Sequence, residues 1–405
     1  MKTILKKAIN PLRFFLNDSR SVGVILLLCT VLSLVLSNSL IGDSYRQFWT
    51  GHIIAGSSSF HLPLNFGHWI NDFLMAFFFL LAGMEIKREL IAGELSSFKK
   101  AVLPFGAALG GMIVPALIFL AFNINSGFEH GWGIPTATDI AFSLGVASLF
   151  GKRVPVGLKI LLMALAIIDD LGAIIVIALF YGGKVHGAFL VTSAVIYLLI
   201  WACNIFKIKF GFIQIILSLL LWLCMLNSGI EASITGVLVA FAMPVNMLPK
   251  IEKKIHLPVN FIIIPLFALA NTAILIPGNI IGSLNTTVAM GVIAGLVIGK
   301  PIGIFLFSRL LITLKIAKLP QHVNWQQILC MGTLAGIGFT MSIFTTALAF
   351  KDDYFRDIAK IAILFSMVFS VVITWLSFRI VEFTSARTKQ ARQLLKPIPS
   401  DIALN

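Results

Sequence analysis

The chain has 405 residues, of which 58% are hydrophobic and 12% charged, whereas about a quarter of the residues of a soluble domain are charged. So few charged side chains cannot cover the surface of two or three soluble domains. A mean hydropathy of +0.98 also excludes an intrinsically disordered chain. The composition therefore predicts an integral membrane protein that crosses the bilayer several times.

The net charge of +14 would suit a nucleic-acid-binding protein if the basic residues shared a soluble face. They lie instead in the gaps between apolar stretches, so we expect no nucleic-acid partner. The four cysteines each fall inside an apolar stretch and share no close spacing, which argues against disulfides and zinc; they are Cys29, Cys203, Cys224 and Cys330. Nothing in the sequence requires a cofactor.

Twelve apolar stretches qualify as transmembrane helices, for which about 20 residues are needed. They lie near 22–40, 68–88, 101–123, 136–150, 156–181, 185–204, 210–227, 229–247, 259–277, 287–312, 328–350 and 359–381. If the N-terminus is cytoplasmic, 25 Lys and Arg residues fall on the cytoplasmic side, five fall outside, and Lys300 lies within a span. This bias follows the positive-inside rule and predicts that both termini are cytoplasmic.

Two segments have alternative interpretations. The basic residues before the first stretch resemble a secretory signal that would be cleaved near 37–39, but the many later stretches favour an uncleaved first span. The outer segment 41–67 is either an ordinary loop or a surface hairpin, and the sequence assigns it no function.

Six ionisable residues stand inside the apolar stretches. A charge at the centre of the bilayer costs at least about 2.5 kcal/mol, so each is a candidate for function. Five acids cannot all be neutralised by one base, so several of the acids must be protonated or bind a cation. The six residues are Asp72, Asp139, Asp169, Asp170, Glu231 and Lys300.

Asp169 and Asp170 lie in the middle of one of these stretches. Adjacent helical residues project about 100° apart, so one carboxylate can line a cavity while the other meets a partner on a neighbouring helix. Lys300 needs such a partner unless its ammonium group extends to the membrane surface. We expect Asp169 to be the partner of Lys300.

Asp139 follows a poor helix start that contains Gly133 and Pro135, which indicates a broken helix. Its carboxylate could cap the freed amides, contact an ion, or do both. A second interrupted segment, 336–342, lies in the later half of the chain. Interrupted segments at corresponding places in two halves are typical of transporters built from inverted repeats.

At these residues the sequence closely resembles the NhaA-type sodium/proton antiporter family, itself an example of that architecture. The resemblance extends over most of the chain. It is carried by Ile70-Asn71-Asp72, Gly83-Met84-Glu85-Ile86-Lys87-Arg88-Glu89-Leu90, Pro135 to Phe142, Ile168-Asp169-Asp170-Leu171-Gly172-Ala173, Pro265-Leu266-Phe267-Ala268, Gly299-Lys300-Pro301 and Gly336 to Phe344.

The resemblance implies an all-α polytopic membrane protein of twelve helices with inverted-topology repeats. Two interrupted helices would cross near the midplane of the membrane. One integral transporter domain would contain a core bundle, approximately 101–181 and 287–381, and an interface bundle, approximately 22–88 and 185–277. The interface bundle usually forms a homodimer, so we expect one here.

The resemblance also implies roles for particular residues. Asp170 would be the main ligand of sodium or lithium, and Asp169 would be its partner. Thr138 and Asp139 would lie where the broken helices cross, with Asp139 and Lys300 compensating charge. A cytoplasmic-side cluster linked to pH response would comprise Glu85, Arg88, Glu89 and Glu252. Many members have His where this chain has Glu231 and Lys253, and these departures bear on the pH profile.

Together these features predict an electrogenic sodium (or lithium)/proton antiporter of the bacterial inner membrane, regulated by pH and serving sodium and pH homeostasis. It would be a transporter rather than an enzyme. A cation channel is the nearest alternative, because carboxylate-lined pathways serve channels too. An intramembrane aspartic protease is a remote one, suggested by Pro115-Ala116-Leu117 and by acids on separate spans; it leaves Lys300 without a role.

Overall fold

The computed structural model describes residues 19–51, 65–206, 211–321 and 323–394, and this part of the chain is helical, with no extended strand. All twelve apolar stretches contain helix. The basic residues Lys2, Lys6, Lys7 and Arg13 lie outside the described part.

The first part of the chain forms α2 (Ser19–Ser37), α3 (Gly42–Thr50), α4 (Phe66–His68), η1 (Trp69–Leu74), α5 (Met75–Ala92), η2 (Glu94–Ser96) and α6 (Phe98–Phe122). The middle part forms η3 (Glu129–Thr136), α7 (Ile140–Leu149), η4 (Gly151–Arg153), α8 (Val156–Phe180), α9 (Gly187–Ile205), α10 (Phe212–Ser228), η5 (Ala232–Ile234) and α11 (Thr235–Ala242).

The last part forms η6 (Val245–Met247), α12 (Leu248–Pro258), η7 (Val259–Ile263), α13 (Ile264–Asn271), α14 (Ile280–Leu284), α15 (Thr287–Ala294), η8 (Gly295–Gly299), α16 (Lys300–Thr313), α17 (Trp325–Ala335), α18 (Phe339–Ala349) and α19 (Asp353–Leu394). Three of the η segments, η1, η7 and η8, are π-helical turns that continue the neighbouring α-helices.

Among the described residues, seven helices are long and apolar enough to cross a bilayer, or up to nine if each of two bent pairs is one span. One bent pair is α2 with α3, and the other is α17 with α18. Three further apolar helices are shorter, over Ile140–Leu149, Phe212–Ser228 and Ala232–Ala242. The structure thus supports a polytopic helical membrane protein, and the count of twelve spans stays a prediction.

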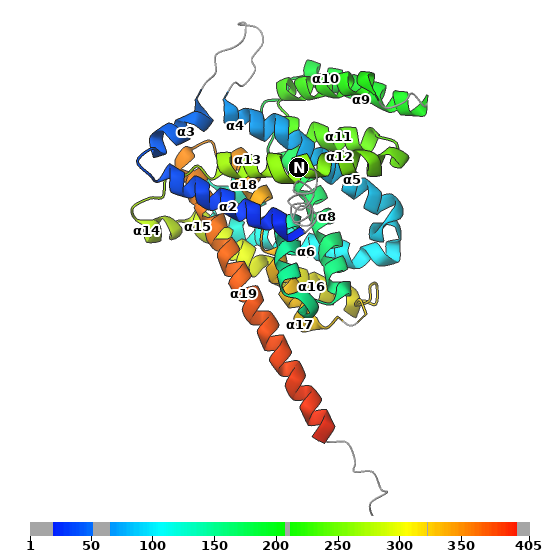
Figure 1. Ribbon diagram of the computed structural model, residues 1–405, viewed down its shortest axis with the longest axis vertical. Helices are drawn as coiled ribbons and strands as arrows, with labels where there is room; N and C mark the ends of the chain where they lie inside the picture. Colours follow the sequence, from blue (N-terminus) through cyan, green and yellow to red (C-terminus); the bar gives the residue numbers. More distant parts are fainter. Residues whose placement is uncertain (1–18, 52–64, 207–210, 322, 395–405) are drawn as a thin grey trace, which may run out of the picture.

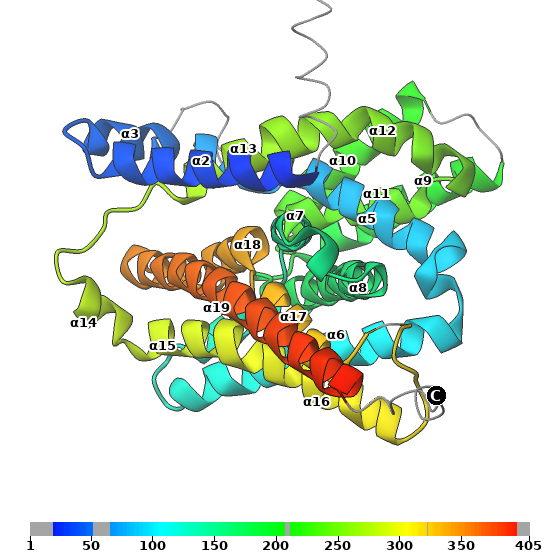
Figure 2. The ribbon, with the colours of Figure 1, turned by 60° about the horizontal axis from the view of Figure 1, so that its bottom comes forward.

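The helices are arranged in two groups that are separated most clearly in the view of Figure 2. There, α2, α3, α13 and α12 follow one side of the molecule, and α6, α15, α16 and α19 follow the other. Helices α7 and α8 lie between them, and α7 packs against α2, α8 and α17. The long α19 extends from the rest of the molecule at its C-terminal end (Figure 1). The helices from distant parts of the sequence therefore meet around α7 and α8.

Two sequence expectations need correction. Helix α12 begins at Leu248 and continues through η7 into α13 as one unit over Val245–Asn271, whereas the sequence suggested a span that starts near 259. The charged residues of α12 interrupt the apolar stretch, so a search for continuous apolar residues missed this helix, whose opposite faces differ in polarity. In the outer segment 41–67, residues Gly42–Thr50 form the helix α3, so this part is not an ordinary loop; residues 52–64, on which the hairpin interpretation rests, lie outside the described part.

Proline explains the widened turns at two of the three π segments. In η8, the backbone N–H of Lys300 donates to the carbonyl of Gly295, five residues back, and Pro301 follows directly. In η7, Ile264 donates to Val259 in the same way, and Pro265 follows. Because proline has no N–H, the carbonyl four residues earlier loses its helical partner, and π turns of this kind often occur at functional sites. One of these π turns, η8, ends directly before Lys300.

Helices α6 and α16 cross at a pair of glycines that allow their backbones to touch. A Cβ atom on Gly110 would lie 2.2 Å from the carbonyl oxygen of Gly303, and a Cβ on Gly303 would lie 2.0 Å from that of Gly110. Small residues allow this close approach between membrane helices. The contact fixes α16, which carries Lys300, against α6.

Lys87 joins α5 to α11, two helices that take no part in the glycine contact between α6 and α16. Its ammonium group donates to the carbonyls of Ala240, Phe241 at 2.7 Å, and Met243. These carbonyls lie at the C-terminal end of α11, where a helix leaves its acceptors without internal partners and its dipole favours a cation. Lys87 therefore caps α11 and fixes α5 to it.

We expect Lys87→Met to lower the free energy of unfolding by about 1.5–3 kcal/mol, the contribution of a hydrogen bond to a charged group. Thermal unfolding of the detergent-purified protein, followed by tryptophan fluorescence, measures this. Lys99→Met, at an exposed position of α6, is the matched control. Equal midpoints for the two variants would show that the cap contributes nothing.

Candidate ion-binding site

The site is built around two helix breaks that contact each other. The first break, residues 137–139, separates η3 from α7. The second separates α17 from α18, whose axes differ by 49°. The backbone N–H of Asp139 donates to the carbonyl of Ile337 at 2.7 Å. The unpaired backbone groups of one break thus find partners in the other, which a buried break requires.

Asp139 caps one broken helix and binds the other. Its Oδ1 accepts from the N–H of Phe142 at 3.0 Å, as an N-cap carboxylate does. Its Oδ2 accepts from the N–H of Thr340 at 3.1 Å and from the hydroxyl of Thr340 at 2.8 Å. The capping interpretation of Asp139 is therefore confirmed, and both oxygens are already engaged. Contact with an ion stays a prediction.

Asp169 and Lys300 form an ion pair between α8 and α16. The Lys300 Nζ lies 2.8 Å from Asp169 Oδ2, and both side chains are completely buried. The same oxygen is 2.6 Å from the Thr138 hydroxyl, and Lys300 also donates to the carbonyl of Thr136 at 2.6 Å. The structure therefore brings Asp169, Lys300 and Thr138 together, and the alternative in which Lys300 extends to the membrane surface is wrong.

One Asp169 oxygen and one Asp170 oxygen have no hydrogen-bond partner in the part of the chain that the structure describes. Asp169 Oδ1 and Asp170 Oδ1 are both buried there and accept no hydrogen bond from the described residues. A buried carboxylate oxygen left in this way is strongly unfavourable as an anion. A proton, a water molecule or a cation has to meet these oxygens.

Asp170 faces a different direction from Asp169 and lines a cavity of about 370 Å³. Thr138, Asp139 and Thr340 line the same cavity, and so do Glu85 and Arg88 of α5. Asp170 is 6% exposed, so its carboxyl is buried at the wall of this cavity. The cavity supplies carboxylate and hydroxyl oxygens, the hard ligands that sodium prefers.

Two residues of the expected cytoplasmic-side cluster, Glu85 and Arg88, line this cavity, and Arg88 contacts the other two, Glu89 and Glu252. Arg88 donates to Glu252 Oε1 at 2.6 Å and lies 3.9 Å from Glu89. Glu89 Oε2 accepts from the backbone N–H of Glu94 at 3.0 Å, so it joins the last turn of α5 to the start of η2. Arg88 and Glu252 link α5 to α12, two segments that are 164 residues apart in the sequence.

The sequence analysis missed three polar residues that line the cavity. His256 and Asn260 line it from α12 and η7, and Thr340 from α18. His256 and Asn260 were missed because the segment before 259 was read as a connection between spans. With α12 recognised as a helix, Glu252 and His256 are four residues apart and share a face, a spacing that could have found His256.

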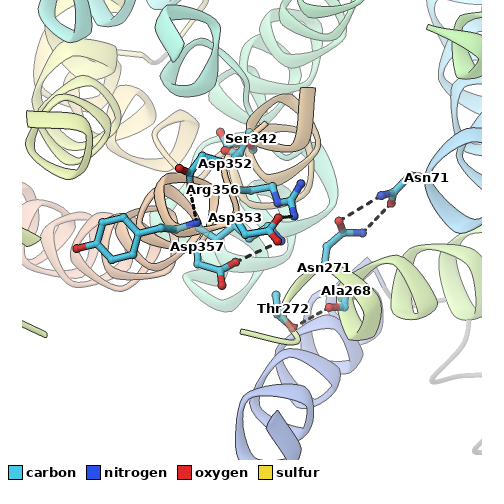
Figure 3. Close-up of polar contacts among 12 residues, drawn as sticks. Asn71, Ala268, Asn271, Thr272, Ser342, Asp352, Asp353, Arg356 and Asp357 are labelled. Atoms are coloured by element: carbon cyan, nitrogen blue, oxygen red, sulfur yellow. Dashed lines mark hydrogen bonds and ion pairs between the residues drawn. The ribbon is translucent and has the colours of Figure 1, made fainter. Parts of the chain in front are cut away.

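The remaining intramembrane acids lie elsewhere. Glu231 accepts from the Ser233 hydroxyl at 3.1 Å and caps η5, and neither Glu231 nor Asp72 lines the cavity. Asn71, next to Asp72, exchanges hydrogen bonds with Asn271 at the end of α13 (Figure 3). This segment therefore joins η1 to α13 instead of contributing to the site.

No group of three or more His, Cys, Asp or Glu side chains in the described residues could hold a metal ion. A cation at Asp170 would therefore have one or two carboxylates and otherwise neutral oxygens as ligands, a set that suits a monovalent cargo ion better than a resident divalent metal.

Comparison with known proteins decides the family. Residues 13–378 match the family described as Na+/H+ antiporter 1. The chain belongs to this family.

Its relatives extend over almost the whole chain. It is 42% identical to the Na(+)/H(+) antiporter NhaA 2 of Clostridium beijerinckii over 398 residues, covering 96% of this chain and 98% of the relative. It is 45% identical to the NhaA of Flavobacterium psychrophilum, covering 91% and 95%. It is 44% identical to the NhaA of Escherichia coli O139:H28, covering 91% and 98%.

These matches confirm the resemblance to NhaA-type sodium/proton antiporters that the motifs indicated. Membership of the Na+/H+ antiporter 1 family makes the chain a transporter and not an enzyme, so the protease alternative is wrong. The bends, the buried ion pair and the cavity described above are thus features of a bacterial membrane antiporter.

Removing one partner of the buried pair should destabilise the protein more than removing both charges. We expect Lys300→Met to cost about 3–5 kcal/mol, because it leaves the Asp169 carboxylate buried without compensation. The double variant Lys300→Met with Asp169→Asn should recover most of this loss. Thermal unfolding in detergent compares the unchanged protein with Lys300→Met, Asp169→Asn and the double variant; a double variant as unstable as the sum of the two single ones would contradict the pairing.

Proposed function

We propose that this protein is an electrogenic sodium (or lithium)/proton antiporter that exports sodium and admits protons across the bacterial inner membrane. One observation carries the proposal: the Asp170 carboxyl, with an oxygen that has no hydrogen-bond partner among the described residues, lines a cavity with Thr138, Asp139 and Thr340, next in the chain to the Asp169–Lys300 pair. Membership of a family of sodium/proton antiporters supports the same conclusion.

Exchange follows from competition for one carboxyl group. In a low-dielectric site the Asp170 anion is unfavourable, so the group holds either a proton or a cation. It cannot hold both at once. If the protonated and sodium-bound forms reorient while the bare anion does not, sodium crosses in one direction only when protons cross in the other. Asp170 is accordingly the cation ligand in this proposal.

Asp169 and Lys300 supply a second group that can change its proton content. While the ion pair is intact, Asp169 is ionised and Lys300 protonated. A cation that enters beside Asp170 would approach Asp169 Oδ1, which has no partner, and would compete with the Lys300 ammonium for that carboxylate. Loss of the Lys300 proton would then accompany sodium binding, so that more than one proton enters for each sodium ion that leaves.

Thr138 and Asp139 position the site rather than titrate in it. Thr138 holds Asp169 through its hydroxyl, and Asp139 joins the two helix breaks through Phe142 and Thr340. The positive ends of the broken helices then lie near the cation, and the Asp139 carboxylate offsets their charge.

The cluster of Glu85, Arg88, Glu89 and Glu252 is proposed to respond to pH. Glu85 and Arg88 line the cavity through which Asp170 is reached, and Arg88 is held by Glu252 of α12. A change in the charge of this cluster would therefore change the charge of the cavity lining beside Arg88. This chain has Glu231 and Lys253 where many family members have histidine. We expect these two differences to change the pH range of that response.

The proposed topology has both termini in the cytoplasm, and polar contacts support it. Arg88 pairs with Glu252, and Arg153 pairs with Glu382; all four lie in segments assigned to the cytoplasmic side. Tyr181 donates to the carbonyl of His130; His130 lies in a segment assigned outside, and Tyr181 lies at the outer end of its span. Within this topology we propose a core bundle of 101–181 and 287–381 that moves against an interface bundle of 22–88 and 185–277, with two copies joined through the latter.

Asp170→Asn should abolish exchange while the protein still inserts and folds, because asparagine fits the same space but carries no exchangeable charge. Sodium-driven proton movement in proteoliposomes, followed with a pH-sensitive dye across a pH series, measures this. Asp352→Asn, at an exposed position before α19, should leave exchange unchanged. Normal sodium-dependent proton movement in Asp170→Asn would contradict the assignment.

Electrogenic exchange also predicts a dependence on membrane potential. With equal pH on both sides, an interior-negative potential of 100 mV should support a steady sodium gradient of about fiftyfold, since moving one net charge through it is worth about 2.3 kcal/mol. Sodium gradients in proteoliposomes with a potassium–valinomycin clamp test this. A gradient that does not depend on the potential would show electroneutral exchange, and sodium flux that continues without protons would favour a channel.

A further inference from the structure

The break between α17 and α18 has two sides that differ in their hydrogen bonding. On the side of α7, three of its carbonyls have donors: Leu334 has the Ser143 hydroxyl at 2.8 Å, Ala335 the Thr138 hydroxyl at 3.0 Å, and Ile337 the N–H of Asp139 at 2.7 Å. The carbonyl of Thr333 differs. In a regular helix it would accept from the N–H of Ile337, which donates to Leu334 instead.

A second carbonyl without a helical donor lies in η8, one turn before Lys300. The N–H of Lys300 donates to Gly295 rather than to Leu296. The next residue, Pro301, has no N–H. The Leu296 carbonyl therefore receives no hydrogen bond from its own helix, neither from four nor from five residues on. A free carbonyl inside a membrane protein has to find a partner on another segment.

Both carbonyls lie beside Gly336, in the break itself. A Cβ atom on Gly336 would lie 2.5 Å from the Leu296 carbonyl oxygen and 3.2 Å from that of Thr333. It would also lie 3.1 Å from Ser370 Oγ. Helix α19, which carries Ser370, packs against α17 and α18 (Figure 2) and against η8. One hydroxyl donor and two acceptors therefore meet around one backbone position.

The Ser370 hydroxyl itself is unused. Ser370 is 1% exposed, and its Oγ has no hydrogen-bond partner among the described residues. The hydroxyls one turn before and one turn after it on α19 are both engaged: Ser366 donates to the carbonyl of Ala362 at 2.7 Å, and Thr374 lies 2.8 Å from the Thr333 hydroxyl. Serine in a membrane helix usually bonds its own backbone, as Ser366 does. Ser370 is thus a buried donor that forgoes this bond beside two free acceptors, which is unfavourable in this conformation.

We propose that Ser370 is a positioning residue of the exchange reaction, whose hydroxyl donates to the carbonyl of Leu296 or Thr333 when the bend between α17 and α18 changes. The inference rests on the proposed antiport, in which the site reorients. Reorientation turns the backbone around Gly336, and the α7 side of the break is already fully paired. A donor on α19 then stabilises the carbonyls on the other side. Because η8 leads directly into Lys300, the same hydrogen bond connects the break to the buried ion pair.

The test is Ser370→Ala, assayed by sodium-driven proton movement in proteoliposomes over a range of sodium concentrations. The maximal rate should fall about tenfold, the effect of losing one hydrogen bond during a rate-limiting reorientation. The sodium concentration for half-maximal rate should not change, since Ser370 does not line the ion cavity. Thermal unfolding should give an unchanged or higher midpoint, because the hydroxyl that is removed has no partner in this conformation.

Ser366→Ala is the matched control on the same face of α19. It removes an equally buried hydroxyl that bonds only its own helix, so it should exchange at the full rate. Ser370→Thr keeps a hydroxyl and should recover most of the rate that Ser370→Ala loses.

Three results would overturn the assignment of Ser370. They are a full maximal rate in Ser370→Ala, a lowered unfolding midpoint that accounts for its slower exchange, and a Ser370→Thr protein as slow as Ser370→Ala. Absence of exchange in both the unchanged protein and Ser366→Ala would instead contradict the proposed antiport, and this inference would fail with it.

Discussion

The buried pair of Asp169 and Lys300 is the interaction on which the rest of the site depends. Two opposite charges are held 2.8 Å apart with no exposure to solvent, where each alone would be very unfavourable. The pair persists because other groups complete it: the Thr138 hydroxyl on Asp169, and the Thr136 carbonyl on Lys300. Both of these come from the segment where η3 ends and the chain is not helical. The broken helix and the ion pair thus require each other.

That dependence extends to the second broken helix. The Thr138 hydroxyl lies within hydrogen-bonding distance of Asp169 Oδ2 and also of the Ala335 carbonyl, at 3.0 Å. A hydroxyl has one proton and can donate to one acceptor at a time. While Asp169 is an anion, it is the stronger acceptor and holds that proton. A change in the charge of Asp169 therefore alters the hydrogen bonding at the end of α17, where the bend towards α18 begins.

The sequence could predict the parts of this site that follow from local chemistry. Charged residues within apolar stretches pointed to Asp139, Asp169, Asp170 and Lys300, because burial of charge has few explanations. The 100° between neighbouring helical residues separated Asp169 from Asp170 in direction, and Lys300 indeed contacts Asp169. The sequence could not predict contacts that depend on how distant helices cross. Thr340 binds Asp139 across 201 residues, and a hydroxyl in a membrane helix can equally well bond its own backbone, as Thr345 does.

Helix α12 illustrates a further limit of sequence reasoning, since its charged residues belong to opposite faces of one helix rather than to a loop. A search for continuous apolar stretches discards such a segment, although its periodicity is helical. The consequence for function is considerable. One face of α12 holds Arg88 through Glu252 and contributes His256 to the ion cavity, and the other contributes Lys250 and Lys254 to a second, apolar cavity of about 440 Å³. Because α12 continues through a π turn into α13, a displacement at its charged end changes the position of Asn260 beside the ion cavity. The apolar cavity and the ion cavity thus share one helix.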